Sequence, residues 1–524
     1  MDLPDLGFRP TLGEAARRAA REFGDLDYLV TPTRRMTFAE ADAASRRLAR
    51  RMLAEGLGKG TRVGLYFTYG HEWLVAWLAA SRIGALVMPF STLYTPAELG
   101  KVLRIGDVDT LITAPSILGR DTAPVLEEAA PGLADQRAGR LYLTSLPYLR
   151  RVWMSGPTDR AWATTVDLEA EPGRDAPGED VLEQVETEVV PADLALVVYT
   201  SGSSAEPKGV VHTQGTVLRD CSEMAARFFA TETGAPGRLL CGMPFFWVGG
   251  VLALSAGIQA PITVVVMERF EPGLALELVE RERVTGVLAW PTLIQAMRDH
   301  PTFAERDLSS CPSLTEGPAD MALTWSPVPG VGGHRGMSET MGQFVGFERR
   351  IIDHDTGEPL PRGIEHEGEL VLRGPGLMAG YYKRERHEVF DEDGWFHTGD
   401  RCFMIEGDER PFFLGRYTEM IKSMGANVAP REVELLLETF PEIRYAFVLG
   451  FPHPERGEEV VAAVVPADGA VLDHDDLRAR ARKQLSSFKV PTRFVELDAD
   501  EVPWLGSGKP DKLTLRKMVE TRTG

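Results

Sequence analysis

A loop of hydroxyl groups and glycines that ends in a lysine is the part of the chain best suited to chemistry. It lies at residues 199–215, YTSGSSAEPKGVVHTQG. Glycines let backbone N–H groups approach an anion, hydroxyls add donors and Lys208 adds a positive charge, so the loop suits a polyphosphate. It differs from a Walker loop, in which the lysine directly follows a glycine, because Pro207 precedes Lys208 and Gly209 follows it. Taken alone, such a loop could also be a plain surface connection.

Four later segments combine charged or hydroxyl side chains with glycines. They are HRGMSET at 334–340, WFHTGD at 395–400, GRYTEMIKSMGANVAPREVE at 415–434 and GSGKPDK at 506–512. In this order, behind the 199–215 loop, they resemble the motifs of the adenylate-forming superfamily. That superfamily includes acyl-CoA synthetases, luciferases and the adenylation domains of peptide synthetases.

The resemblance implies a site for ATP and AMP. Glu339 is expected to hold Mg²⁺ against the phosphates, and Asp400 is expected to accept hydrogen bonds from both ribose hydroxyls, with Arg416 supporting the ribose. From the residues alone, Asp400 could also be a turn-capping aspartate. The residues expected to bind the nucleotide are Thr200, Ser201, Gly202, Ser203, Ser204, Lys208, Gly336, Met337, Ser338, Glu339, Asp400, Arg416 and Lys509.

The implied chemistry has two steps. A carboxylate reacts poorly with nucleophiles, so it is first joined to AMP, a good leaving group, and a thiol then attacks the carbonyl. Joining an anionic carboxylate to an anionic phosphate requires charge neutralisation and alignment, and the resemblance assigns that role to Lys509 together with Glu339. It assigns Lys422 and Gly425 to the coenzyme A side of the second step. Read alone, Lys509 and Lys422 could also be solvated surface lysines.

The chain departs from the family pattern mainly around ATP. Ala205 replaces a glycine of the phosphate loop, and LTEGPADM at 314–321 replaces a small-residue segment that meets adenine. Arg335 stands where an aromatic residue commonly stacks on adenine, and the stretch before Glu339 is short. These departures have two interpretations: ordinary variation in a fully active ligase, and a weakened or lost adenylation step. Thr418 occupies the hinge position, where the family usually has Asp or Lys.

The segment from Leu239 to Met267 contains no charged residue. Prolines and glycines interrupt it, so a buried loop, helix and strand are favoured over a membrane span. In the family this segment lines the acyl pocket, which would contain Trp247, Gly249 and Gly250. Trp247 replaces a common histidine, and the glycines remove side-chain volume, so a bulky, mainly hydrophobic carboxylic acid is expected. The alternative is that the glycines only serve packing.

The elements that must position these motifs are predicted from periodicity. RVGLYF and ALVMPF are typical of buried strands around a helix near residues 73–81, and Thr37 with Glu40 predicts a helix-capping box. Strand and helix alternation predicts an α/β fold with two α/β subdomains in a large N-terminal part. Residues 345–415 predict a small distorted β-barrel. After residue 416 a mobile α+β lid is expected, so the predicted domains are 1–415 and 416–524.

Composition excludes several functional classes. The net charge of −20 argues against non-specific binding to nucleic acid or to an anionic membrane. Four widely spaced cysteines favour buried reduced thiols in a cytoplasmic protein, and MDLPDLGFRP at the start lacks a signal-peptide pattern. The acidic stretch 353–369 lacks calcium-loop spacing and is expected to form solvated turns, and His212 and His334 have no visible triad partner.

The sequence therefore predicts an acyl-CoA ligase that forms or uses an acyl-adenylate and transfers the acyl group to coenzyme A. If adenylation is lost, a partner ligase would supply the adenylate. The alternatives are a stand-alone ligase that loads a carrier-protein thiol, a non-catalytic nucleotide or acyl sensor, and an oxidative luciferase-like enzyme.

Overall fold

The structure is a computed structural model. It describes residues 5–200, 207–219, 236–316, 326–327, 335–336, 347–409, 411–417, 420–423, 426–428, 430–454, 456–485, 487–504 and 510–523. The chain forms two compact units. The first unit contains Met1–Ala322, Phe344–Phe347 and Arg373–Gly394, and the second contains Leu323–Gln343, Glu348–Leu372 and Trp395–Gly524.

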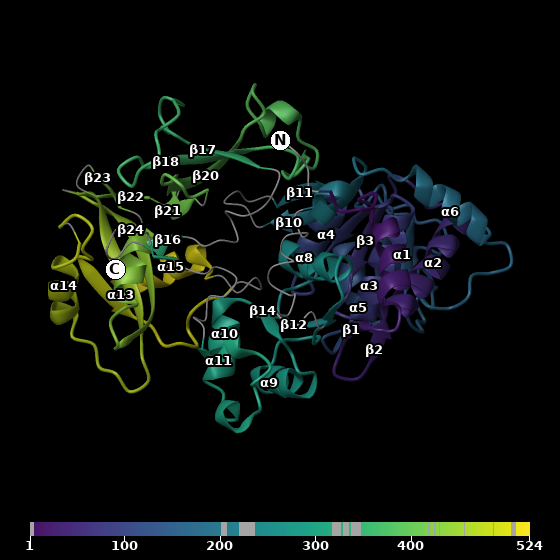
Figure 1. The fold of residues 1–524 in the computed structure, drawn as a ribbon, viewed down its shortest axis with the longest axis horizontal. Helices are drawn as coiled ribbons and strands as arrows, with labels where there is room; N and C mark the ends of the chain where they lie inside the picture. The colour runs from purple at the N-terminus through teal and green to yellow at the C-terminus, as the bar shows by residue number, and fades with distance from the viewer. Residues whose placement is uncertain are drawn as a thin grey trace. The chain divides into compact units, whose positions relative to one another are not determined.

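The larger sheet of the first unit has eight strands in the order β19-β11-β10-β4-β3-β5-β8-β9 (Figure 1). The strands from β10 to β9 run parallel, whereas β11 and β19 are antiparallel additions at one edge. Their bounds are β3 Arg62–Tyr66, β4 Leu86–Pro89, β5 Thr110–Thr113, β8 Arg151–Met154, β9 Thr164–Thr165, β10 Leu194–Thr200, β11 Lys208–Thr213 and β19 Gly380–Tyr381.

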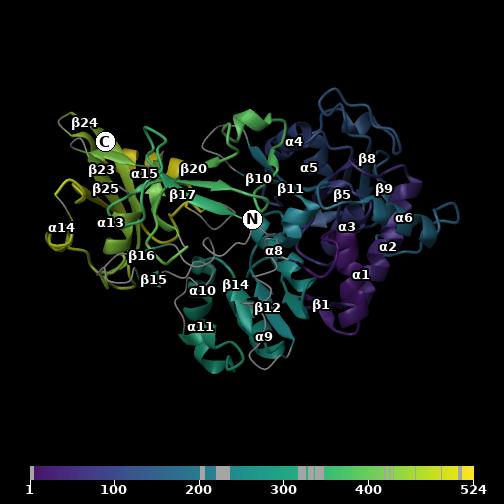
Figure 2. The same ribbon diagram turned by 45° about the horizontal axis from the view of Figure 1, so that its top comes forward.

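The second sheet of this unit has five strands in the order β14-β12-β13-β1-β2 and is separate from the eight-stranded sheet (Figure 2). Four of the five strands are parallel, as expected where helices connect successive strands. Their bounds are β1 Asp27–Val30, β2 Arg35–Thr37, β12 Gly237–Cys241, β13 Ile262–Val265 and β14 Gly286–Leu288. The uncharged segment 239–267 was expected to form a buried loop, helix and strand. Helix α8 (Val248–Gly257) and strand β13 are present, but the segment begins within strand β12 instead of a loop.

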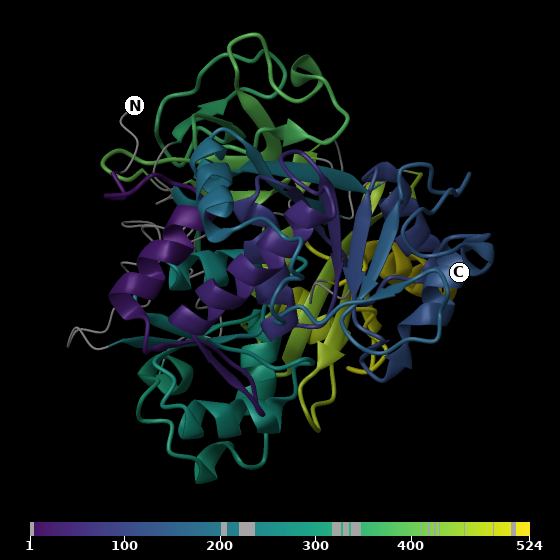
Figure 3. The ribbon, with the colours of Figure 1, turned by 90° about the vertical axis from the view of Figure 1, so that its right-hand side faces the viewer.

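Helices of the first unit cover both sheets. α1, α2 and α3 stack beside one another (Figure 3), and α3 is buried along almost its whole length. The predicted capping box is present at the start of α2, where Thr37 and Glu40 exchange side-chain to backbone hydrogen bonds. The helix bounds are α1 Leu12–Phe23, α2 Phe38–Ala54, α3 His71–Arg82, α4 Pro96–Ile105, α5 Thr122–Ala129, α6 Glu179–Glu188, α9 Pro272–Arg281, α10 Pro291–Arg298 and α11 Pro312–Glu316.

The acidic connection at 170–192, which its composition assigns to the surface, contains α6 and contributes to the interior. Leu182 is fully buried, and the carboxylate of Glu186 accepts a 2.8 Å hydrogen bond from Arg82. Arg82 is itself buried in α3 and also contacts Asp42 of α2. A buried guanidinium needs charged partners, which explains why an acidic segment is drawn inward here.

Within the described residues, the second unit contains two larger sheets and one short pair of strands. The first has the order β17-β18-β20-β21 and occupies the segment where a small barrel was expected. The second has the order β23-β22-β25-β24, with β26 beside β25. Their bounds are β17 Glu348–Ile352, β18 Gly368–Arg373, β20 Phe396–Phe403, β21 Phe412–Arg416, β22 Ile421–Ser423, β23 Ala426–Val428, β24 Ile443–His453, β25 Gly457–Pro466 and β26 Arg493–Glu496. The remaining short pair, β15 (Ser326–Pro327) and β16 (Arg335–Gly336), is antiparallel.

The long hairpin β24–β25 carries a hydrophobic core on each face. Alternate side chains pack with α13 (Pro430–Leu437) and α14 (His474–Arg482) on one face and with α15 (Lys512–Thr523) on the other (Figure 1). The α/β fold with a smaller α+β C-terminal part is confirmed. The predicted boundary between residues 415 and 416 lies within the second unit, at the end of β21, and stays a prediction about the moving lid.

The expectations about the cysteine thiols and about a membrane-spanning segment can be compared with the described residues. Cys241, Cys311 and Cys402 are buried free thiols, and burial raises the pKa of each. Within the described ranges, no helix combines the length and the apolar character needed to cross a bilayer.

Candidate active site

The strands that flank the phosphate-type loop pair with each other. β10 is buried from Ala195 to Val198 and ends at Thr200, at the carboxyl edge of the parallel strands, where α/β sheets commonly bind ligands. Thr200 lies opposite Lys208 in the β10–β11 ladder, and its hydroxyl donates a 3.4 Å hydrogen bond to the Lys208 carbonyl oxygen. The six residues between Thr200 and Pro207 lie outside the described residues, and with them Ser201, Gly202, Ser203 and Ser204.

Lys208 and Gly209 begin the returning strand. The exposed Lys208 ammonium lies 5.3 Å from the centroid of the Tyr381 ring on β19. Gly209 is needed for close packing, because a Cβ there would lie 2.7 Å from a methyl carbon of Val197. Small size at this position therefore lets β11 pair with β10 beside the lysine without displacing Val197.

Asp400 and Arg416 occupy opposed positions of adjacent strands in the second unit. The β20–β21 ladder places Asp400 directly across from Arg416, and the Arg416 Nε donates a 2.9 Å hydrogen bond to Asp400 Oδ1. The Asp400 side chain is buried, whereas the Arg416 side chain is 57% exposed. The two residues that the resemblance assigns to the ribose are thus in contact, with the guanidinium still accessible to a ligand.

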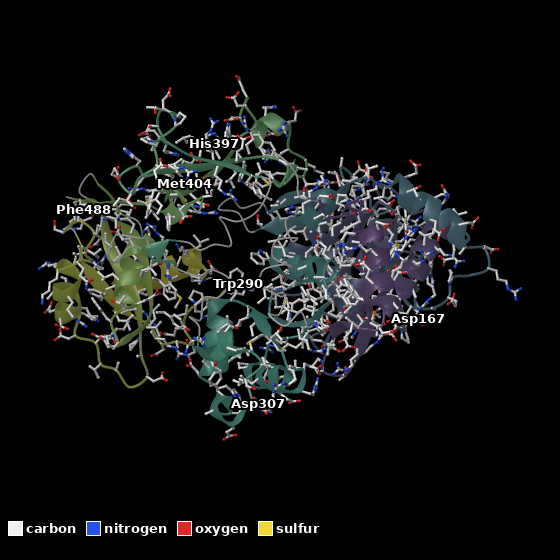
Figure 4. All side chains as sticks on the ribbon, in the orientation of Figure 1. Asp167, Trp290, Asp307, His397, Met404 and Phe488 are labelled. Carbon is white, nitrogen blue, oxygen red and sulfur yellow. The ribbon has the colours of Figure 1, made fainter. Side chains whose placement is uncertain are left out.

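A buried glutamate beside Asp400 was missed by sequence reasoning. Glu369 of β18 accepts a 3.0 Å hydrogen bond from the Gly399 N–H through Oε1, and its Oε2 lies 3.2 Å from His354 Nδ1 and 3.3 Å from His397 Nδ1. Figure 4 labels His397 on this sheet. The solvated-turn expectation for 353–369 is therefore wrong at its C-terminal end, where β18 buries Glu369, whereas His354 lies in an exposed turn as expected. Within the described residues, no group of three or more potential ligands could hold a metal ion.

Aromatic rings gather around the predicted acyl-pocket residues. Trp247 precedes α8, and its ring centroid lies 4.9 Å from that of Trp290, which Figure 4 labels ahead of α10. The Phe245 ring, two residues before Trp247, packs near those of Tyr69 and Trp73, at 5.5 and 5.1 Å between centroids. Burial raises the pKa of the Tyr69 phenol, so this wall carries no charge at neutral pH.

The geometry of the two glycines favours packing over a free pocket. A Cβ at Gly249 would lie 2.5 Å from a ring carbon of Trp247, and one at Gly250 would lie 2.3 Å from the Pro244 carbonyl oxygen. The volume that each glycine leaves is therefore taken by Trp247 or by the backbone. The pocket role of all three residues stays a prediction, with the tryptophan ring as the surface that an acid could contact.

The two ends of the predicted lysine loop are fixed to each other. Trp504 and Pro510 form an antiparallel bridge, and the Asp511 N–H donates a 2.7 Å hydrogen bond to the Pro503 carbonyl oxygen. The Trp504 ring packs edge-on against Tyr445 and Phe447 of β24, at 5.8 and 6.0 Å between centroids. Asp511 then caps the start of α15 through the N–H groups of residues 513 and 514.

Several predicted residues cannot be compared with the structure. Gly336 lies in β16 and Lys422 in β22, and only their backbone is described. The following predicted residues lie outside the described residues: Met337, Ser338, Glu339, Thr418, Gly425 and Lys509. Thr200 and Lys208 belong to the first unit, and Asp400 and Arg416 belong to the second.

Comparisons with known proteins agree with these features. Residues 16–382 match the AMP-binding enzyme family, and residues 432–509 match the AMP-binding enzyme C-terminal domain. The chain is 31% identical to a feruloyl-CoA synthase of Amycolatopsis sp, over 92% of this chain and 94% of that protein. It is also 31% identical to a CoA ligase of Mycobacterium tuberculosis, over 97% of this chain and 99% of that protein. The name of that ligase specifies a propanoyl group that bears a methylated dioxo-octahydroindene ring.

Solved structures give the same fold. An amide bond synthetase from Marinactinospora thermotolerans is 26% identical, with a TM-score of 0.74 over 97% of this chain and 99% of that one. An anthranilate CoA ligase in complex with anthranoyl-AMP is 19% identical, with a TM-score of 0.78 over 98% of this chain and 99% of that one, which supports the fold alone. With the loop strands, the Asp400–Arg416 pair and full-length relatives in agreement, the chain belongs to the family of AMP-binding enzymes, within the adenylate-forming superfamily, and is an acid–thiol ligase most like the acyl-CoA ligases.

Proposed function

We propose that the protein joins a bulky, mainly hydrophobic carboxylic acid to coenzyme A through an acyl-adenylate. The observation that carries the proposal is the pair of Asp400 and Arg416, whose contact at 2.9 Å leaves the guanidinium exposed beside a buried carboxylate. A carboxylate in this position can accept hydrogen bonds from the two ribose hydroxyls, while the arginine contributes donors to the same sugar.

The remaining roles follow from charge. The Lys208 ammonium, at the edge of the phosphate loop, is suited to a phosphate oxygen, and Lys509 would neutralise the charge that builds up as the acid carboxylate meets the α-phosphate. Mg²⁺, when bound by Glu339, would neutralise phosphate charge and lower the barrier to pyrophosphate departure. After adenylation, Lys422 and Gly425 would face coenzyme A, whose thiol attacks the acyl carbonyl and expels AMP.

The aromatic wall supports an acid with a ring or a similarly bulky apolar body. The Trp247 and Trp290 rings pack against each other at an interplanar angle of 49°, and an aromatic contact with such a ring contributes about 0.5–1.5 kcal/mol beyond the burial of area. Feruloyl, coumarate and fused-ring acyl groups appear in the names of relatives. Those names belong to those proteins, and together with the tryptophan pair they make aryl and alicyclic acids the first class to test.

The test is incubation of the protein with ATP, Mg²⁺, coenzyme A and a panel of aryl, alicyclic and straight-chain acids, followed by mass spectrometry of the products. We expect an acyl-CoA with AMP from a ring-bearing acid and little product from short straight chains. Parallel reactions contain a carrier protein or an amine in place of coenzyme A. A product formed only with one of those acceptors would show that the acyl acceptor is not coenzyme A. Binding of nucleotide or acid without any product, even from supplied acyl-adenylate, would refute the enzyme proposal and leave the sensor alternative.

A further inference from the structure

The ribose-binding turn is a bulge in the ladder between β18 and β20. Glu369 pairs with Arg401 and Val371 pairs with His397, so residues 398–400 of β20 face a single residue of β18. Gly399 adopts a positive φ of 71°, which a glycine tolerates and most residues do not. The bulge removes backbone groups from the regular ladder, and these groups need other partners.

Side chains supply those partners. The Glu369 carboxylate accepts the Gly399 N–H at 3.0 Å, and the Asp400 N–H donates to the Thr398 hydroxyl at the same distance. The Thr398 hydroxyl in turn donates a 2.7 Å hydrogen bond to the Leu370 carbonyl oxygen. Glu369 and Thr398 therefore hold the two peptide groups that immediately precede the Asp400 side chain.

Glu369 is itself held from two directions. His354 of the turn after β17 and His397 of β20 both present Nδ1 to the Glu369 Oε2, while Oε1 faces the bulge. The glutamate is 5% exposed, so its carboxylate has little water to compete with these contacts. Three hydrogen bonds restrict the Glu369 carboxylate to one orientation. Because one of them comes from the Gly399 N–H, the position of that peptide group is fixed as well.

The same cluster reaches the end of β21. The His354 ring stacks on the Tyr417 ring with 3.9 Å between centroids and an interplanar angle of 11°. Tyr417 directly follows Arg416, the partner of Asp400. Glu369 thus contacts the bulge on one side and, through His354, the residue beside Arg416 on the other.

We propose that Glu369 is a positioning residue for ribose recognition: its carboxylate fixes the 398–400 bulge, and through it the Asp400 carboxylate, in the orientation that accepts the ribose hydroxyls. This inference rests on the proposed role of Asp400. Glu369 touches neither nucleotide nor acid in this scheme, and it acts only through the geometry of its neighbours.

The test measures AMP affinity by calorimetry, with AMP, 2′-deoxy-AMP and 3′-deoxy-AMP as ligands, so it does not depend on turnover. The wild-type protein should bind AMP about tenfold or more tightly than either deoxy analogue, because each lacks a hydroxyl that hydrogen-bonds to a charged group. Glu369→Gln keeps the shape and one acceptor for Gly399 but lacks the charge that faces the histidines. It should reduce that preference by about threefold or more, and Glu369→Ala should nearly abolish it.

The control is Glu496→Gln. Glu496 also pairs with a histidine, His474, at 2.9 Å, but it lies on β26 in the other sheet of the unit. This variant should keep the wild-type preference, and Glu369→Gln should unfold within a few degrees of it. Wild-type discrimination that survives unchanged in folded Glu369→Gln overturns the positioning role and leaves Asp400 in place. A wild-type protein that does not distinguish AMP from its deoxy analogues, with Asp400→Ala binding equally well, overturns the ribose role of Asp400 and this inference with it.

Discussion

His212 lies within β11, four residues after Lys208 and opposite Leu196 of β10. Burial lowers the pKa of its imidazole from 6.5 to about 4, so the ring is neutral at physiological pH. Because the unfolded chain takes up this proton more readily than the folded one, His212 links stability to pH. The stability is fully present above the unfolded pKa and is lost as the pH falls toward the folded value.

We therefore expect acid to weaken the wild-type protein between pH 6.5 and about 4, and His212→Gln to reduce that loss. The contribution of one such group is at most about 1.4 kcal/mol per pH unit across the window. Urea unfolding at pH 7.5, 6.5, 5.5 and 4.5 measures it, with the exposed His387→Gln as the matched control. Parallel pH profiles for wild type and His212→Gln would show that another group causes the acid sensitivity.

Gly209 gives a second prediction at the scale of one residue. Gly209→Ala would bring a methyl group to 2.7 Å from Val197 and 3.2 Å from Tyr199 and Tyr382. We expect the free energy of unfolding to fall by about 1–3 kcal/mol, as for an overpacked core, and ATP binding to weaken because Lys208 is adjacent. Gly58→Ala is the control, since a Cβ there would meet no atom within 4 Å. Equal stability of the two variants would contradict the packing argument.

The sequence predicted individual site residues where a motif names them and missed those that only the fold brings together. Asp400 and Arg416 were named from their motifs, and the β20–β21 register brings them into contact, although their roles stay predictions. Glu369 and His397 are separated by 28 residues, and no local pattern reveals that adjacent strands will oppose them. The one available signal was an acidic residue inside the otherwise apolar strand sequence GELVL.

At the scale of helices and strands, local sequence patterns predicted the elements, but they did not reveal contacts between residues far apart in the chain. The capping box of α2 and the helix followed by a strand within 239–267 follow from residues close in sequence. α6 was not expected to contribute to the interior, because the Glu186–Arg82 contact joins residues 104 positions apart. Charge pattern alone does not show which acidic segment will meet a buried arginine.

The bridge between Trp504 and Pro510 joins the two ends of the segment that carries Lys509. Lys509→Ala should abolish adenylate formation and spare the conversion of supplied acyl-adenylate to acyl-CoA. Trp504→Ala removes the ring that packs on β24, so it should lower the adenylation rate in the same selective way but by a smaller factor. Separate assays of the two half-reactions measure this, with the exposed Leu513→Ala as the control. Equal loss of both half-reactions in Trp504→Ala would indicate general damage to the domain.

At the scale of the whole molecule, a net charge of −20 opposes the approach of ATP and coenzyme A, both polyanions. Affinity must come from local donors, so changes close to the phosphates have large effects. Ala205 belongs to the predicted phosphate loop, whereas the 314–321 segment and Arg335 are predicted to meet adenine, and each well-aimed donor contributes on the order of 10²–10³ in rate. The proposed weakening of adenylation is thus a property of the assembled site and not of a single residue.

ATP–pyrophosphate exchange with the accepted acid tests this weakening. We expect slow exchange beside rapid conversion of supplied acyl-adenylate, in which case a partner ligase would provide the adenylate. Ala205→Gly combined with Arg335→Phe should then raise the exchange rate, and no gain in that variant would direct attention to the shortened 314–338 region. Rapid exchange by the wild-type protein would reject the weakening and identify a self-sufficient ligase.

The hairpin β24–β25 has a consequence for how this protein can diverge. β25 pairs with β22, the strand of Lys422, and β24 supports Trp504 at the base of the Lys509 segment. The two lysines thus depend on separate attachments to one rigid scaffold. Mutations that loosen one attachment leave the other intact, so a gene duplicate could lose the ability to make the mixed anhydride and still consume it. Descendants of such an enzyme could divide one reaction between two proteins without any change of fold.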